Sequence, residues 1–321
     1  MKKFAIIGCG RIALRHAENI NRIGKLVAVC DVVKEKADSL GSAYNAVSYT
    51  SVDEMLAQEK DLEIVAVCSP NGYHAEHIIK SLQAQKDVLT EKPLCLTKAA
   101  AWQIIETEKY CRRRLFVVKS ARYNPIIQRL KRAIESGQLG EIYSFHLSCL
   151  WNRKDEYYTG WKGKVFPDGG TLYNQFSHYI DVMIWLFGDV ENVNGFKANK
   201  AHQSSVEFED CGAVAMQMKN NIIGSFQWSV NAYQKNFEIA LTLLAEKGTI
   251  KIGGENLNEV HFQQTENDIT FPAYKKENWS NHNELYDHLV SVFDEKGTGF
   301  PDAFDGLRAV ETIERIYKAT S

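Results

Sequence analysis

Lys92 and His178 are the two side chains whose sequence surroundings indicate chemistry. Lys92 lies in Glu91-Lys92-Pro93, directly after a short apolar run, and the proline restricts the backbone of that turn. His178 shares one helical face with Asn174 and Asp181, at spacings i, i+4 and i+7. An imidazole can accept a proton near neutral pH, and an ammonium can stabilise a developing alkoxide. The pair predicts an active site, although spacing alone also allows a structural His178 bonded to Asp181, and either group could be the base.

A glycine-rich turn at residues 8–13 predicts a dinucleotide site. It follows the first apolar run and opens a helical pattern. Gly8 permits a tight turn, and Gly10 lets the backbone approach a pyrophosphate at the helix N-terminus. Asp31 ends the second apolar run about 20 residues further on, where a carboxylate bonds the ribose 2′-hydroxyl and repels a 2′-phosphate. NAD is therefore expected rather than NADP.

The elements that must position these residues alternate between short Val/Ile-rich runs and helical stretches over residues 1–121. This alternation predicts an α/β domain with a doubly wound parallel sheet, the Rossmann arrangement. Ligands bind outside the carboxyl ends of such strands, so the turns after the fourth and fifth strands should face one crevice. The predicted cofactor contacts are Gly8, Gly10, Arg11, Ile12, Asp31, Ser69, Asn71, His74, Glu91 and Lys92.

Residues 122–321 follow a different pattern and predict a second, α+β domain for substrate binding and oligomerisation. Several short segments alternate apolar and polar residues, which predicts an open, mostly antiparallel sheet. Amphipathic helices near 171–187, 282–295 and 303–319 are expected to cover one face. The pattern suggests that the other face carries apolar residues, including Phe226, Trp228, Ile239 and Leu241. An uncovered apolar face favours a homo-oligomer, a dimer or tetramer, through this sheet.

The segment 151–164 interleaves cations with aromatic residues. Such a loop can stack a base or sugar and neutralise phosphate or carboxylate, although its composition equally fits a solvated surface loop. Lys119 and Arg122, after the sixth strand, should add positive charge to the same cleft. The predicted substrate contacts are Lys119, Arg122, Arg153, Tyr157, Tyr158, Trp161, Asn174, Gln175 and His178.

Composition excludes several classes of protein. The 321 residues carry 38 Lys and Arg against 40 Asp and Glu, so the global basic field of a nucleic-acid binder is absent. No apolar run reaches the roughly 20 residues of a membrane span, and the N-terminus lacks a signal-peptide pattern. The seven scattered cysteines, without a CxxC pair, argue against disulfides and structural zinc and favour the cytoplasm. His74 and His77 have no third ligand in view, so no metal is expected.

Three motifs in order, GCGRIA, EKP and DGG…NQxSHYxD, resemble the glucose–fructose oxidoreductase/inositol dehydrogenase (Gfo/Idh/MocA) family across essentially the whole chain. Residues 115–163 look most like bacterial UDP-N-acetylglucosaminuronate 3-dehydrogenases of O-antigen synthesis. The resemblance implies Lys92 as the cationic catalytic residue and His178 as the proton acceptor. Many relatives have aspartate where this chain has Asn174, a departure typical of the nucleotide-sugar branch.

The expected function is an NAD-dependent dehydrogenase that oxidises the C3 hydroxyl of a nucleotide-linked sugar acid in lipopolysaccharide biosynthesis. Three alternatives remain open: the same fold acting on a free polyol, aldose or inositol; a glycosidase that retains its NAD; and a non-catalytic NAD-binding regulator. A regulator would not need both Lys92 and His178. The sugar's stereochemistry, the number of subunits and the reoxidant of NADH stay undetermined by sequence.

Overall fold

The computed structural model describes residues 1–274 and 281–320, and the chain divides into two compact units. Unit 1 comprises Met1–Lys119 and His282–Val310, and unit 2 comprises Ser120–Asn281 and Glu311–Ser321. The first crossing between units lies close to the boundary expected at 121/122. Residues 282–310, however, group with unit 1 and not with the second domain to which their position in the sequence had assigned them. The chain therefore returns to its first unit after completing most of the second.

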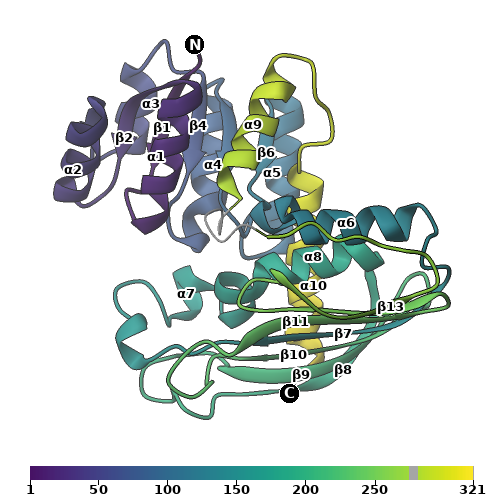
Figure 1. Ribbon diagram of the computed structural model, residues 1–321. Coiled ribbons are helices and arrows are strands. Elements are labelled where there is room, and N and C mark those ends of the chain that lie inside the picture. Colours follow the sequence, from purple (N-terminus) through teal and green to yellow (C-terminus); the bar gives the residue numbers. More distant parts are fainter. Residues whose placement is uncertain (275–280, 321) are drawn as a thin grey trace. The chain divides into compact units, whose positions relative to one another are not determined.

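Unit 1 is built on a six-stranded parallel sheet with the order β3-β2-β1-β4-β5-β6 (Figure 1). Four central strands are almost fully buried, as continuous Val/Ile-rich runs require when helices cover both faces. The doubly wound sheet is confirmed. Only β3, a three-residue partly exposed strand, was not marked by an apolar run. The strands are β1 (Lys3–Ile7), β2 (Lys25–Cys30), β3 (Val47–Tyr49), β4 (Ile64–Val67), β5 (Asp87–Thr90) and β6 (Leu115–Val117).

The helices of unit 1 include one that the sequence alone had placed elsewhere. Helix α9 (His282–Phe293) packs against α1 and not on the second sheet, so its predicted location was wrong. Its apolar stripe, with Leu285 and Leu289, is buried, and periodicity reveals such a stripe without revealing its partner. The other helices are α1 (Arg11–Ile23), α2 (Lys34–Tyr44), α3 (Val52–Gln58), α4 (His74–Gln83) and α5 (Lys98–Cys111).

Unit 2 contains a seven-stranded sheet with the order β13-β12-β11-β7-β10-β9-β8, antiparallel except where β7 pairs with β10. This confirms the open, mostly antiparallel sheet (Figure 1). The strands are β7 (Ile142–Leu150), β8 (Val190–Ala198), β9 (Cys211–Met218), β10 (Ile223–Ser229), β11 (Glu238–Ala245), β12 (Gly248–Gly253) and β13 (Glu259–Thr265). The helices are α6 (Pro125–Glu135), α7 (Val165–Asp168), α8 (Ser177–Phe187) and α10 (Ala303–Ala319), of which Glu311 onwards lies in unit 2.

The two faces of the unit 2 sheet differ in a way that corrects one prediction. Phe226, Trp228, Ile239 and Leu241 are all buried, and they lie on the helix-covered face instead of the open one. Phe145 of the same face stacks on Phe187 of α8, with ring centroids 4.5 Å apart. The open face carries mostly small and polar side chains from the alternate positions of each strand, such as Ser144, His146, Ser225, Gln227 and Thr242.

Two further features of the chain are the character of its helices and the state of its cysteines. No helix in the described part of the chain has the length and apolar character needed to cross a bilayer. All seven cysteines are free thiols.

Candidate active site

The glycine turn between β1 and α1 has the geometry that a dinucleotide requires. Gly8 has a φ of +92°, and a Cβ there would lie 2.6 Å from the backbone nitrogen of Ser69, so only glycine fits. Nothing lies within 4 Å of a Cβ built on Gly10, which caps α1 without a side-chain hydrogen bond. Open space therefore faces the N–H groups of the first helical turn, where a pyrophosphate can bind. Arg11 is exposed and Ile12 half-buried at this end of α1.

Asp31 follows β2 and is held against the same turn. Its carboxylate accepts hydrogen bonds from the backbone N–H of Cys9 at 2.8 Å and from that of Val33 at 2.9 Å. These bonds fix the carboxylate beside the glycine turn while the residue stays half-exposed. The Asp31 carboxylate fits NAD, because an anchored carboxylate accepts a hydrogen bond from a ribose hydroxyl and repels the 2′-phosphate of NADP.

The turns after β4 and β5 are tied together by His74, a structural role that its predicted contact with the cofactor did not include. His74 is buried, with Nε2 lying 2.8 Å from the carbonyl oxygen of Ser69 and Nδ1 lying 2.7 Å from that of Pro93. Burial lowers the pKa of His74. The residue therefore positions the two turns and has no ring nitrogen left for a ligand. Ser69 and Asn71 are themselves largely buried at these strand ends.

Glu91 also has a structural role that its predicted contact with the cofactor did not include. Its side chain is buried, and its Oε1 lies 3.0 Å from Nε2 of His16 and 3.4 Å from Nε2 of His282. Oε2 accepts the backbone N–H of Lys92 at 3.1 Å. Lys92 is half-buried at the end of this turn. The sequence analysis did not identify His16 or His282, although His16 lies on the apolar face of its helix, a place where a polar residue needs a partner.

In unit 2, Asn174 and His178 are presented by an irregular helical segment. A π-helix, Leu172–Phe176, runs directly into α8. Between residues 170 and 184, only Asn174 and His178 are not fully buried, so this segment is accessible at these two positions. The Nδ1 atom of His178 is buried, while the residue as a whole is half-buried. Single-turn π segments occur frequently at functional sites.

Asp181 is not accessible, and Arg122 forms a salt bridge with it. Asp181 is buried, and the Arg122 guanidinium donates to both of its oxygens, Nε to Oδ2 at 2.7 Å and Nη2 to Oδ1 at 2.8 Å. This bidentate pair joins the start of unit 2 to α8. This salt bridge gives Arg122 a structural role that its predicted contact with the substrate did not include. Lys119, the last residue of the first segment of unit 1, is also buried.

The cationic–aromatic segment contacts the π-helix through Arg153, Tyr157 and Gln175. The Arg153 Nε donates to Oε1 of Gln175 at 3.1 Å, and Nε2 of Gln175 donates to the Tyr157 hydroxyl at 2.9 Å. The Arg153 guanidinium also lies over the Trp151 and Tyr157 rings, 4.7 and 5.1 Å from their centroids. The structure therefore unites these predicted substrate residues with the segment that carries His178.

The rest of the same segment adds aromatic surface. Tyr158 packs edge-on against Tyr157, and the Lys162 ammonium lies 4.0 Å from the centroid of the Tyr157 ring. Trp161 is half-buried. Gly163 donates its N–H to the buried carboxylate of Asp168 at 2.7 Å, which closes the segment onto the turn before the π-helix. Aromatic, cation–π and hydrogen-bond contacts therefore hold this segment against its neighbours.

A buried carboxyl group anchors the turn before the π-helix, and the sequence analysis missed it. Glu209 accepts a hydrogen bond from the Tyr317 hydroxyl at 2.8 Å, and that hydroxyl accepts the backbone N–H of Leu172 at 3.0 Å. Gly170, with a φ of +115°, leaves room for this hydroxyl, since a Cβ would lie 2.4 Å from it. Burial raises the pKa of Glu209 to about 7. Nothing local in the sequence joins Glu209 to Tyr317, which belongs to α10.

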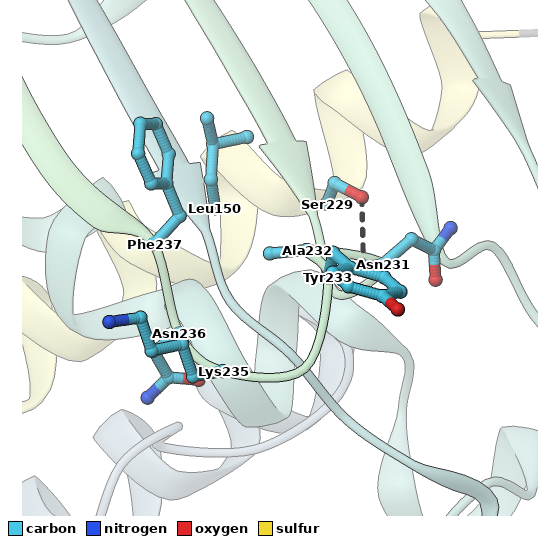
Figure 2. A pocket seen from close by; sticks show the side chains of 8 residues that line it. All are labelled: Leu150, Ser229, Asn231, Ala232, Tyr233, Lys235, Asn236 and Phe237. Carbon is cyan, nitrogen blue, oxygen red and sulfur yellow. Dashed lines mark hydrogen bonds between the residues drawn. The ribbon is translucent and has the colours of Figure 1, made fainter.

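A hollow of about 390 Å³ lies at one end of the open face of the unit 2 sheet (Figure 2). Leu150 and Ser229, in register on β7 and β10, form its floor, and Tyr233 and Phe237 of the following loop flank it. Its floor lies on the face opposite to that covered by α8. The hollow is therefore separate from Asn174 and His178.

Two family models match the sequence of this chain. Residues 2–119 match the sequence profile of the Gfo/Idh/MocA oxidoreductases with an NAD-binding Rossmann fold, and residues 127–251 match the C-terminal domain of the same family. The chain belongs to the Gfo/Idh/MocA family. It is accordingly an NAD-dependent oxidoreductase that acts on CH–OH groups.

Individual relatives differ in what their names say they act on. The WlbA dehydrogenase of Bordetella pertussis, solved with NADH and UDP-GlcNAcA, is 30% identical, with a TM-score of 0.91 over 99% of this chain and 96% of that one. Inositol 2-dehydrogenase of Salmonella paratyphi B is 28% identical over 78% of this chain and 73% of its own length. Glucose-6-phosphate 3-dehydrogenase of Bacillus subtilis is 25% identical over 100% of this chain and 97% of its own length. Family membership therefore establishes a dehydrogenase of sugar-like substrates, and the particular substrate is a separate question.

Proposed function

We propose that this dehydrogenase oxidises the C3 hydroxyl of a nucleotide-linked sugar acid such as UDP-N-acetylglucosaminuronate. The single observation that carries the proposal is the similarity, over nearly the full length of both chains, to a dehydrogenase solved with NADH and UDP-GlcNAcA. The cationic and aromatic cluster around Arg153 and Tyr157 supports it, because a diphosphate and a uronate carboxylate both need cations. A neutral cyclitol needs none.

In this proposal the chain's own residues supply proton transfer and charge stabilisation. NAD, when bound, supplies the hydride acceptor, and the turn at Gly8–Gly10 together with Asp31 would hold it. His178 receives the hydroxyl proton at Nε2, because its Nδ1 is buried. Lys92 stabilises the developing alkoxide electrostatically, a contribution that is commonly the largest in a site without water. Arg153 and Tyr157 bind the anionic part of the substrate.

A substrate panel tests the proposal. The chain is incubated with NAD and UDP-N-acetylglucosaminuronate, UDP-N-acetylglucosamine, myo-inositol or glucose 6-phosphate. Reduced-nicotinamide absorbance is recorded together with the mass of the sugar product, so that turnover is detected even where NADH is reoxidised in place. We expect the nucleotide-linked uronate to lose two hydrogens at the highest kcat/KM. A higher kcat/KM for inositol or glucose 6-phosphate would refute the substrate assignment, and sugar release without a keto product would indicate a glycosidase.

Variants test the assigned residues. Lys92→Met and His178→Asn should each lower kcat by at least about 100-fold while the Kd for NAD changes little, because both groups act on the substrate. The matched control is Lys109→Met, which removes an exposed lysine of α5. A normal kcat in either variant would remove that residue from the mechanism.

We also propose that copies of this chain associate through the open face of the unit 2 sheet. The supporting observation is a set of large apolar side chains that lie on that face or on the loop beside its hollow and are at least 63% exposed: Phe196, Ile223, Tyr233 and Phe237. Light scattering coupled to size exclusion should give a dimer or tetramer. Replacing Tyr233 and Phe237 with serine should shift the mass toward the monomer.

A further inference from the structure

Three segments far apart in the sequence meet at one buried carboxylate in unit 1. His16 belongs to α1, the helix that opens at the glycine turn; Glu91 follows β5; and His282 is the first residue of α9. All three are buried. Tyr286 of α9 adds a fourth member, because its hydroxyl lies 2.7 Å from Nδ1 of His16. We call these four residues the Glu91 cluster.

The pattern of donors shows what the cluster requires. Three N–H groups face the two oxygens of Glu91: Nε2 of His16 and of His282 at Oε1, and the backbone nitrogen of Lys92 at Oε2. An ionised carboxylate, which only accepts, can take all three of these bonds. Both imidazoles then carry their proton on Nε2, and Nδ1 of His16 accepts the hydroxyl proton of Tyr286. Both oxygens of Glu91 and both ring nitrogens of His16 thus have a partner.

The charge balance agrees with that arrangement. Burial alone would raise the pKa of Glu91, but the hydrogen bonds and charges of His16 and His282 outweigh burial and hold this pKa well below its usual range. Burial also lowers the pKa of His16. The donors around Glu91 therefore favour its ionised form.

We propose that Glu91, His16, His282 and Tyr286 are positioning residues that hold the backbone at Lys92 in place for catalysis. This inference rests on the proposed function in taking Lys92 as a catalytic residue. The carboxylate bonds the N–H of Lys92 itself, so the point from which the ammonium projects is fixed by the cluster. Because His16 belongs to α1, the same carboxylate also ties the lysine turn to the helix whose N-terminus would hold the pyrophosphate. Misplacement of a catalytic group by about 1 Å can cost 100-fold in rate.

His16, Glu91 and His282 each offer one atom of a type that binds metals, and these three atoms all lie within 4.8 Å of one another. A divalent cation is therefore the alternative to the hydrogen bonds. Hydrogen bonds account for the three atoms fully, since each already lies at bonding distance from a complementary group. We therefore expect neither EDTA nor added Zn²⁺ or Mn²⁺ to change the unfolding midpoint of the chain. A midpoint that rises with either metal and falls with EDTA would overturn the hydrogen-bonded cluster.

A double-mutant cycle tests the positioning role with NAD and UDP-N-acetylglucosaminuronate. Glu91→Gln keeps the shape but offers one acceptor to three donors, so kcat should fall about 10- to 100-fold while the Kd for NAD changes less than about threefold. Glu91→Gln on a Lys92→Met background should cause no further loss, because Glu91 acts through Lys92. Equal losses in both backgrounds, or an unchanged kcat, would overturn the proposal. A wild-type kcat in Lys92→Met alone would instead refute the assignment of Lys92 and thus the proposed function.

Matched controls and a readout independent of turnover complete the test. The matched control is Glu63→Gln. The Glu63 carboxylate, directly before β4, also accepts a backbone N–H, that of Lys3 at 3.0 Å. This variant should leave kcat unchanged. Tyr286→Phe removes only the hydroxyl that orients His16, so it serves if Glu91→Gln folds poorly, and it should lower kcat severalfold. Amide hydrogen exchange at Lys92, measured without NAD, should accelerate in Glu91→Gln. An unaltered exchange rate at Lys92 would contradict the proposal that the Glu91 cluster fixes the backbone of this turn.

Discussion

Replacement of Glu209 with glutamine should make the chain more stable at neutral and alkaline pH. The carboxyl group lies buried beside Tyr317 and, with a pKa raised by burial to about 7 against an ordinary value of 4.5, it resists ionisation in the folded state. Between these two pH values the unfolded chain releases the proton and the folded chain keeps it. The free energy of unfolding therefore falls as pH rises through this window and levels off above it.

The size of the effect follows from the two pKa values. A difference of about 2.5 units at about 1.36 kcal/mol per unit corresponds to about 3 kcal/mol of stability lost between pH 4.5 and pH 7. Glutamine carries no titrating proton, and its amide oxygen still accepts from the Tyr317 hydroxyl. The gain of Glu209→Gln over wild type should therefore increase by about 3 kcal/mol from about pH 5 to about pH 8.

Urea unfolding of both chains at several pH values, followed by tryptophan fluorescence, measures this gain. Comparing the change with pH removes any constant offset that the amide introduces. Glu191→Gln, at an exposed position of β8, is the matched control and should show a gain that is flat with pH. A flat gain for Glu209→Gln as well would refute the assignment of a buried, neutral carboxyl group at this site.

Three further outcomes test particular contacts. Gly8→Ala should abolish measurable NAD binding in a calorimetric titration and cost about 1–3 kcal/mol of stability, because its Cβ would meet Ser69 in a left-handed backbone conformation. Arg122→Met should lower the free energy of unfolding, measured in urea, by about 3–5 kcal/mol, because it leaves Asp181 charged and buried. A change in substrate KM without a change in stability would instead indicate that Arg122 binds the substrate. Asp31→Ser should raise the ratio of NADP to NAD affinity at least about tenfold in competition binding, whereas an unchanged ratio would mean that this carboxylate does not select the cofactor.

Local sequence determined the parts of this protein whose physics is local. A glycine at a left-handed φ, a proline at the first turn of a helix and a continuous apolar run each restrict the backbone within a few residues, so the glycine turn, α6 and the buried strands were predictable. The order of three short motifs was enough to indicate the family. The accessibility of both Asn174 and His178 agrees with helical spacing, which involves residues only four apart.

Tertiary structure decided the partners, because burial and charge pairing depend on residues that sequence separates. Alternation on a strand defines two faces without saying which face a helix will cover, so Phe226 and Trp228 were placed on the wrong one. A cation after a strand end can face a ligand or a buried carboxylate, and in this chain Arg122 forms a salt bridge with Asp181. The carboxylate of Glu91 needed donors from residues 16 and 282, and only the folded chain brings those positions together, since a buried charge is stable only where its partners meet it.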